Sequence, residues 1–97
     1  MNVVLRRSSK RDKKFTADVN GKKVRFGDPN YQDFTQHKDV ERKQRYIQRH
    51  RKNENWSDVT TPGFYAKNIL WNRPTLRESV KNLNKRFSNV TFKMVSQ

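Results

Sequence analysis

The dipeptide Asn20-Gly21 constrains the fold of this chain more than any other feature. It joins two short segments, FTADV (15–19) and KKVRF (22–26), in which polar and apolar residues alternate. Asn-Gly is the preferred pair for a two-residue type I′ hairpin turn, because both central positions of that turn need a positive φ. Pairing outward from the turn places Phe15 opposite Phe26 and collects the apolar side chains on one face. The sequence therefore predicts an antiparallel hairpin in this register.

Two further strands are expected to join the hairpin. One is the apolar start of the chain, at 3–6, and the other is the alternating segment at 90–95. Together with the hairpin they predict a small antiparallel sheet, and with about three helices they predict an α+β fold. At 97 residues the chain is short enough for one domain,. A core this small has to be compact or has to be completed by a partner.

The first predicted helix is the longest. Asp33 or Thr35 serves as its N-cap, and it extends to about Lys52,. At 100° per residue, five cations fall in one stripe about 80° wide, and Val40 and Ile47 lie on the opposite side. The cations of the stripe are Lys38, Arg42, Arg45, Arg49 and Lys52.

Two shorter helices follow. The segment 64–71 is apolar on nearly all sides, so we expect a short buried helix that begins after a Thr61 cap with Pro62 at its first position,. The second follows a capping-box pattern, Thr75-Leu-Arg-Glu78, after a break at Pro74,. Its apolar residues recur every three or four positions, which predicts a stripe that packs on the core. They are Leu76, Val80, Leu83 and Phe87.

Charge is the second strong constraint on function. Twenty-three lysines and arginines against nine acidic residues leave a net charge of +14. Self-repulsion at this level destabilises a compact chain and favours an anionic partner. The stripe carries one sign only, whereas a solvated helix face usually mixes signs at i, i+4. The charge pattern predicts an anionic partner but does not distinguish nucleic acid from an acidic protein or an anionic membrane surface.

A second basic segment lies between the first strand and the hairpin. Residues 6–14, RRSSKRDKK, have six cations in nine positions and are predicted to form a flexible basic loop or arm,. We expect its cations to contact the same anionic partner as the helical stripe. They are Arg6, Arg7, Lys10, Arg11, Lys13 and Lys14.

Catalytic chemistry has few candidates in this sequence. His37 and His50 would point about 140° apart on one helix, so they cannot share a ligand, and we interpret them as surface or interface residues. The scattered carboxylates predict no metal pair, and we expect no cofactor and no enzymatic activity. Four aromatic residues, Trp56, Phe64, Tyr65 and Trp71, could stack on bases. Because the chain has so few apolar residues, we assign them to the core.

The compartment follows from what the sequence lacks. Without cysteine there are no disulfides, which fits a reducing compartment,. No apolar run reaches the roughly 18–20 residues of a membrane span, and the start of the chain has the reverse order of a secretory signal. We expect a soluble protein made inside a cell.

Motifs over residues 26–87 resemble those of a known family. That family consists of small basic proteins of unknown function encoded by nucleocytoplasmic large DNA viruses, including chloroviruses and their relatives. The similarity rests on Phe26-Gly27, Tyr31, Asp33-Phe34-Thr35, His37-Lys38-Asp39, Arg42-Lys43, Tyr46-Ile47, Arg49-His50, Glu54-Asn55-Trp56, Gly63-Phe64, Leu70-Trp71-Asn72 and Pro74-Thr75-Leu76.

The resemblance implies a viral setting and leaves two functions open. The first is a structural protein of the virion, a minor capsid component that uses its basic faces to hold capsid or other virion proteins with acidic surfaces. Low apolar content favours it, since partners would complete the core. The second is a nonspecific DNA-binding protein that packages the genome. The stripe and the basic arm favour this alternative.

Overall fold

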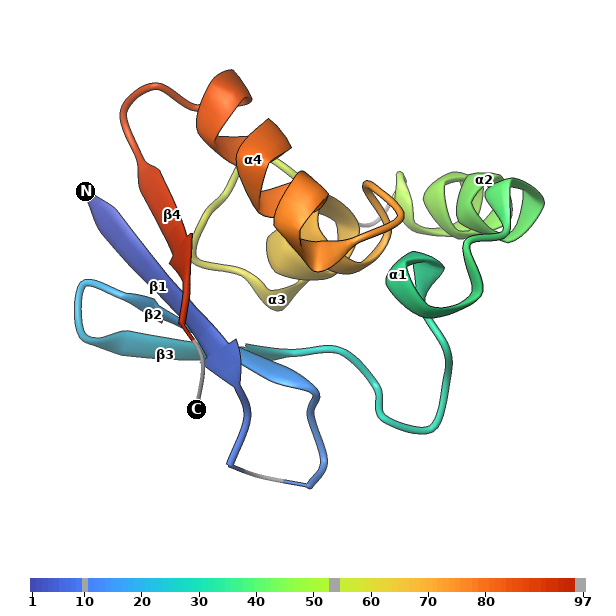
Figure 1. The fold of residues 1–97 in the computed structure, drawn as a ribbon, viewed down its shortest axis with the longest axis horizontal. Helices are drawn as coiled ribbons and strands as arrows, with labels where there is room; N and C mark the ends of the chain where they lie inside the picture. The colour runs from blue at the N-terminus through green and yellow to red at the C-terminus, as the bar shows by residue number, and fades with distance from the viewer. Residues whose placement is uncertain (10, 53–54, 96–97) are drawn as a thin grey trace.

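A four-stranded sheet forms one layer of the molecule, shown in Figure 1. The structure, a computed structural model, describes residues 1–9, 11–52 and 55–95. The sheet has the order β3-β2-β1-β4. Its strands are β1 (Asn2–Arg7), β2 (Phe15–Val19), β3 (Lys22–Phe26) and β4 (Thr91–Met94).

The predicted hairpin is confirmed in its full register. Phe15 pairs with Phe26, and the other four predicted pairs follow toward the turn. Asn20 has φ 52° and Gly21 has φ 84°, as a type I′ turn requires. The rings of Phe15 and Phe26 stack with their centroids 5.9 Å apart. Turn chemistry and the alternating pattern specify the same register, which explains why this prediction succeeded.

The fold class is α+β as predicted, but the sheet is mixed rather than wholly antiparallel. β4 pairs in parallel with β1, and Val3 lies opposite Phe92. The alternating pattern of a strand places the same side chains on the core face in either direction, so it could not reveal this direction. The helical segment between β3 and β4 carries the chain across one face of the sheet to the free edge of β1. A parallel pair requires a crossover connection of this kind.

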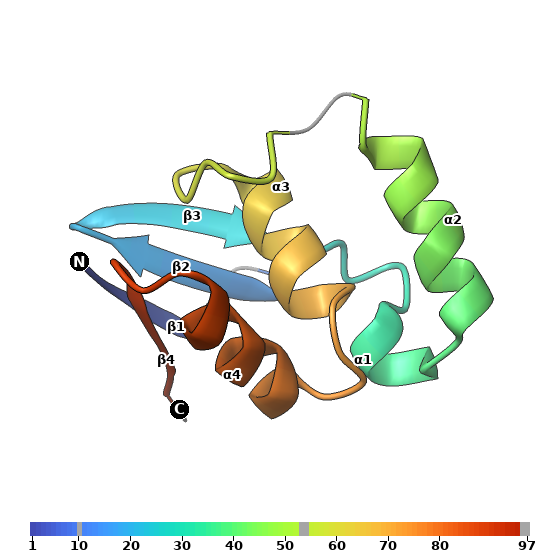
Figure 2. The same ribbon diagram turned by 90° about the horizontal axis from the view of Figure 1, so that it is seen from above.

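The helical layer lies on one side of this sheet. Figures 1 and 2 show α3 and α4 over the strands, whereas α1 and α2 lie beside the sheet. The helices are α1 (Phe34–His37), α2 (Val40–His50), α3 (Pro62–Tyr65), a π-helix η1 (Ala66–Leu70) that continues α3, and α4 (Leu76–Arg86).

The predicted long helix is two helices, so its single stripe is also wrong. Lys38 ends α1 in the left-handed conformation with φ 57°, and its N–H donates to the Phe34 carbonyl. Asp39 then begins α2, because its Oδ1 accepts from the N–H groups of Glu41 and Arg42 at 3.0 and 3.3 Å. A short aspartate side chain competes for backbone donors in this way and starts a new helix.

The core fills the space between the sheet and the α3–η1–α4 layer. Leu83 of α4 and Phe64, Tyr65 and Ile69 of α3–η1 are fully buried against the inner face of the sheet. Phe64 and Tyr65 are therefore core residues, as predicted. Thr61 caps α3 through its Oγ1, which accepts from the Phe64 N–H at 3.3 Å.

The chain completes this core from its own residues. Among the residues that the structure describes, the large hydrophobic side chains that are exposed are Met1, Tyr31 and Val40. Of the two alternatives, a compact core or one completed by a partner, burial in the described residues favours the compact core. Because most of the few apolar side chains pack on the inner face of the sheet, few remain to form a second apolar surface.

The apolar stripe of α4 is confirmed, and Leu83 lies at its centre. Leu76, Val80 and Phe87 are partly buried against the same core. Replacement of Leu83 by Ala should lower the free energy of unfolding by about 2–5 kcal/mol, because a buried cavity replaces the side chain. Urea denaturation measures this loss. The exposed neighbour Lys81→Ala is the control and should change stability by less than about 0.5 kcal/mol. Equal midpoints for Leu83→Ala and the wild type would contradict the assigned packing.

Candidate functional site

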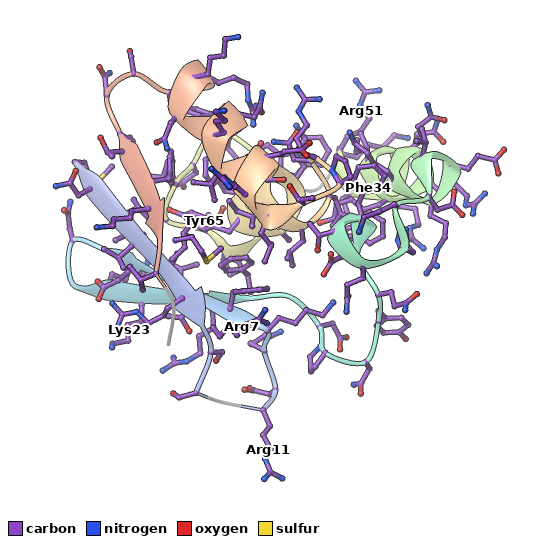
Figure 3. The ribbon with its side chains drawn as sticks, in the orientation of Figure 1. Arg7, Arg11, Lys23, Phe34, Arg51 and Tyr65 are labelled. Carbon is purple, nitrogen blue, oxygen red and sulfur yellow. The ribbon has the colours of Figure 1, made fainter. Side chains whose placement is uncertain are left out.

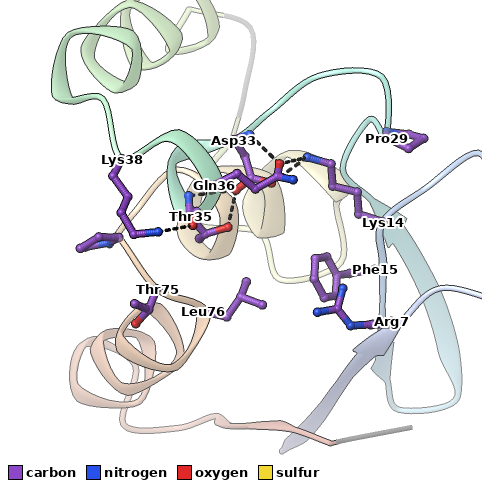
Figure 4. Close-up of a pocket in the computed structure, with 11 residues that line it drawn as sticks. Arg7, Lys14, Phe15, Pro29, Asp33, Thr35, Gln36, Lys38, Thr75 and Leu76 are labelled. Atoms are coloured by element: carbon purple, nitrogen blue, oxygen red, sulfur yellow. Dashed lines mark hydrogen bonds and ion pairs between the residues drawn. The ribbon is translucent and has the colours of Figure 1, made fainter.

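Lys14, predicted as part of the basic arm, has a structural role instead. Its Nζ donates to the Tyr31 carbonyl at 2.6 Å, to Asp33 Oδ2 at 2.8 Å and to Gln36 Oε1 at 2.7 Å. Figure 4 shows this side chain reaching from the residue before β2 to α1. The side chains of Lys14 and Asp33 are only 13% and 4% exposed. An ammonium group has three donors, so Lys14 has none left for an anionic partner.

Asp33 links this ion pair to the start of α1. Its Oδ1 accepts from the Thr35 N–H at 2.9 Å, while Gln36 Oε1 accepts from the Asp33 N–H at 3.0 Å. This reciprocal pair is a capping box,. One carboxylate thus caps a helix and pairs with Lys14, which fastens α1 to the start of β2.

The loop between β1 and β2 is shorter than the basic arm predicted at 6–14. Arg6 and Arg7 belong to β1, and the Ser8 N–H donates to the Lys14 carbonyl at 2.9 Å, which closes the loop. The Arg7 guanidinium lies 5.3 Å from the centre of the Phe15 ring. Lys10 lies outside the described residues.

Arg11 and Lys13 are the exposed cations of this loop. Figure 3 shows Arg11 at the tip of the loop, pointing away from the body. A hollow of about 540 Å³ lies between the base of the loop, α1 and the start of α4. Arg7 and Lys38 are among the residues that line it.

Three of the five predicted stripe residues remain together on α2. Arg42, Arg45 and Arg49, here called the arginine row, line a groove of about 790 Å³ between α2 and the loop 27–33. Lys38 lies outside the row at the end of α1, where its Nζ donates to the Thr35 carbonyl at 2.8 Å. Lys52 lies beyond the end of α2 and is exposed.

The side of α2 that faces the body was predicted wrongly. Val40 is 57% exposed, whereas Tyr46 is only 8% exposed. Tyr46 stacks on Trp71 with the ring centroids 4.4 Å apart and the planes 3° from parallel. In η1 the Trp71 N–H donates to the Ala66 carbonyl five residues back, at 3.1 Å. This π-turn carries Trp71 to α2, and the aromatic contact takes the place of the expected aliphatic one.

Lys43 is the second attachment of α2. Its Nζ donates to the Asn72 carbonyl at 2.6 Å and lies 5.0 Å from the centre of the Phe34 ring. Burial lowers the pKa of Lys43, and the positive charge of Arg73 lowers it further. Both attachments hold one side of α2 against the body, and the arginine row lines the groove next to them.

The two histidines lie in different helices, so the angular argument that separated them does not apply. His37 lies 5.2 Å from the Trp71 ring and His50 lies 4.3 Å from the Tyr46 ring. His37 Nδ1 accepts from the Asp39 N–H at 2.9 Å, so the junction of α1 and α2 uses the neutral form,. In the described ranges no three His, Cys, Asp or Glu residues are grouped as a metal site would need.

The outer face of the sheet is a basic surface that the sequence reasoning missed. Four cations lie on the face opposite the core, since their neighbours along each strand are buried,. Figure 3 shows one of them, Lys23, pointing away from the helices. The alternating pattern of the hairpin already places Lys23 and Arg25 on the outer face. Only the strand order shows that Arg6 of β1 and Lys93 of β4 lie on the same face. The set is Arg6, Lys23, Arg25 and Lys93.

Carboxylates neutralise little of this surface. Within the described ranges, ion pairs join Lys14 to Asp33 and Arg45 to Glu41. The second pair is 3.9 Å long with side chains 63% and 84% exposed, so it contributes little. The arginine row therefore keeps most of its positive charge, whereas the outer sheet face also carries one carboxylate, Asp18 of β2, opposite Lys23.

Comparison with known proteins finds similarity to one family model over part of the chain. Residues 3–50 match the model of a family of unknown function (DUF5754). No curated protein and no solved structure matches the chain. The matched range extends from β1 to the end of α2, so it contains the Lys14–Asp33 pair and the arginine row. In the part of the chain that the structure describes, no helix has the length and apolar character to cross a membrane.

The Lys14–Asp33 pair supplies the first test of this region. Replacement of Lys14 by Met should lower the free energy of unfolding by about 3–5 kcal/mol, because it leaves the Asp33 carboxylate buried without its partner. Chemical denaturation measures the loss. Lys13→Met removes the same charge from an exposed neighbour and should change stability by less than about 0.5 kcal/mol. Similar losses in the two variants would show that net charge, not the pair, is responsible.

His37 supplies the second test, through pH. Burial lowers the pKa of His37 below its ordinary value of 6.5, and the charges of Arg42 and then Lys14 act in the same direction, while Asp39 and Asp33 oppose them. The unfolded chain therefore binds a proton first as the pH falls. The stability that neutral His37 contributes should be complete above pH 6.5 and decline below it.

Denaturation midpoints between pH 8 and pH 5 measure this decline. His37→Gln removes the titrating group, so the decline in the variant should be smaller than in the wild type. His50→Gln is the control and should leave most of the decline in place. Parallel pH curves for the wild type and His37→Gln would contradict the assignment.

Proposed function

We propose that this protein is a non-enzymatic protein that binds DNA through the phosphate backbone, without sequence preference. The observation that carries the proposal is the arginine row along the groove. Arg42, Arg45 and Arg49 line the same groove along α2, where Arg42 is half-buried and the other two are exposed. Within the described residues, one exposed, long ion pair offsets their charge. Such a row without an anion costs energy, since like charges at this spacing repel each other.

The dimensions of the row suit a nucleic-acid strand. Arg42 and Arg49 are seven residues apart, which is about 10.5 Å along the helix axis. Four consecutive phosphates of one DNA strand span a similar distance along the duplex axis, because neighbouring phosphates are about 3.4 Å apart in that direction. Guanidinium groups bind phosphate oxygens through paired hydrogen bonds, which makes arginine well suited to this contact.

The completed core also favours a partner held by charge. A partner that docks by apolar burial needs an apolar surface of several hundred Å². The exposed large hydrophobic side chains of the described residues are few. Electrostatic attraction therefore has to supply most of the binding energy. Contacts between cations and phosphates do not distinguish one base sequence from another.

A structural role in a virion is the second candidate, and a different observation favours it. Tyr31 is 70% exposed and lines the groove opposite the arginine row. Tyrosine and arginine are enriched in protein–protein interfaces, so the groove also suits a segment of a capsid protein with acidic residues. The viral setting itself rests on the motif resemblance over residues 26–87.

Salt dependence of DNA binding tests the first candidate. The triple variant Arg42→Gln, Arg45→Gln, Arg49→Gln should bind duplexes of different sequence more weakly and to the same extent. The slope of log K against log salt should shrink by about 0.9 for each lost phosphate contact, or up to about 2.7. Fluorescence anisotropy at several salt concentrations measures both quantities.

A matched control is available on α4. Arg77, Lys81 and Lys85 are exposed there, so their triple replacement by Gln removes the same charge from another face. That variant should keep most of the slope. Equal loss in both triples would assign the binding to net charge and not to the row.

Fractionation of virions tests the second candidate. If the protein is a shell component, it should remain with the capsid when the DNA is removed. The arginine-row triple should then reduce its incorporation, with little effect on DNA affinity. Recovery with the DNA instead would contradict a shell role.

A further inference from the structure

A second group of cations lies apart from the groove, where α2, η1 and α4 meet. It comprises Lys43 of α2, Lys67 of η1, Arg73 of the loop between η1 and α4, and Arg86 of α4. None of these side chains lines either hollow described above. Lys43 and Lys67 are half-buried, while Arg73 and Arg86 are exposed. The cluster is thus built partly into the body but remains open to solvent.

Asparagine side chains hold this cluster together. Arg86 Nη2 donates to Asn68 Oδ1 at 2.6 Å, and Arg86 Nε donates to Asn82 Oδ1 at 2.8 Å. Asn72 Nδ2 also donates to Asn82 Oδ1, at 2.8 Å. Lys43 in turn donates to the Asn72 carbonyl. One hydrogen-bonded network therefore joins cations from two helices through neutral oxygens.

The cluster lacks the counter-charge that such cations usually have. In the described ranges no carboxylate forms an ion pair with any of the four. Lys67 Nζ lies 5.2 Å from the centre of the Trp56 ring. Burial lowers the pKa of Lys67, and the charges of Arg86 and then Lys43 lower it further. Partly desolvated like charges repel each other strongly, so the arrangement is unfavourable unless an anion occupies it.

Asn68 gives a second, independent observation at this cluster, a buried amide donor without a protein acceptor. It is 1% exposed, and its Oδ1 is already an acceptor for Arg86. Its Nδ2 is buried without a hydrogen-bond partner in the described part of the chain. A buried donor that stays unpaired costs about 1–3 kcal/mol, so native structures usually supply an acceptor.

We propose that the cluster of Lys43, Lys67, Arg73 and Arg86 binds one phosphate group. Arg86 uses two of its five N–H donors on asparagines, and Lys43 uses one of its three on Asn72, so both retain donors for a ligand. Four positive charges without a carboxylate exclude a metal cation and favour a dianion over a single carboxylate. Phosphate supplies several acceptor oxygens, which arginine and lysine bind through charge-assisted hydrogen bonds.

Thermal unfolding in inorganic phosphate tests the site. Phosphate is titrated against chloride at constant ionic strength, and the unfolding midpoint and tryptophan fluorescence are followed. Phosphate should raise the wild-type midpoint, because it binds the folded state. Replacing Lys67 by Met, or Arg73 by Gln, should raise the apparent Kd about ten- to hundredfold, as expected for loss of a charge-assisted contact. Lys81→Gln on the exposed side of α4 should keep the wild-type response.

Stability without phosphate separates a ligand site from a structural contact. In phosphate-free buffer, Lys67→Met should unfold at the wild-type midpoint or above it, since a partly desolvated charge has been removed. A structural lysine would lower the midpoint on removal. The proposal is overturned if phosphate and chloride give the same wild-type midpoint, or if Lys81→Gln loses as much of the response as Lys67→Met.

The source of the phosphate is resolved by a second titration with duplex DNA. If the backbone supplies it, Lys67→Met should weaken DNA binding and lower the salt slope by about 0.9. If free phosphate or a monoester supplies it, DNA binding should stay unchanged while the response to inorganic phosphate is lost. The site stands apart from the proposed function, because the arginine-row triple should keep the phosphate response even if DNA binding fails.

Discussion

The ion pair between Lys14 and Asp33 is the contact on which the placement of α1 and α2 depends. It fastens the start of the hairpin to α1, and α1 leads directly into α2. Gly27 allows this approach, because the Lys14 N–H donates to the Gly27 carbonyl at 3.0 Å and a Cβ at position 27 would lie 2.8 Å from Leu70 Cδ1. Gly27 also has φ +88°, which other residues rarely adopt. A buried pair and one glycine thus place the loop 27–33 as one wall of the groove.

Local signals accounted for the parts of the fold that could be predicted from sequence. The Asn20-Gly21 turn, the Thr61 and Thr75 caps, and the spacing that buries Leu83 each depend on neighbours within a few residues. The direction of β4 and the side of α2 that faces the body depend on residues far along the chain. Tyr46 contacts Trp71, 25 positions away, and no helical periodicity of α2 alone could reveal that partner.

The candidate site was predictable to a similar extent. Arg42, Arg45 and Arg49 follow from helical spacing, because all three lie within α2. Lys14 was misassigned, since a run of cations does not show which of them turns inward to meet a carboxylate nineteen residues later. Lys67 was also hidden, because it lies in a segment whose neighbours are core residues. Only the packing of η1 against α4 brings it near Arg86.

The uses of the acidic residues explain why so much positive charge remains at the surface. Asp28, Asp33, Asp39 and Asp58 each accept a hydrogen bond from a backbone N–H in a turn or at a helix start. Such carboxylates stabilise local structure, but their positions are set by the backbone and not by nearby cations. That leaves five of the nine acidic residues to offset 23 lysines and arginines. The shortage of carboxylates therefore leaves attraction to an external anion as the main way to offset the repulsion among the cations.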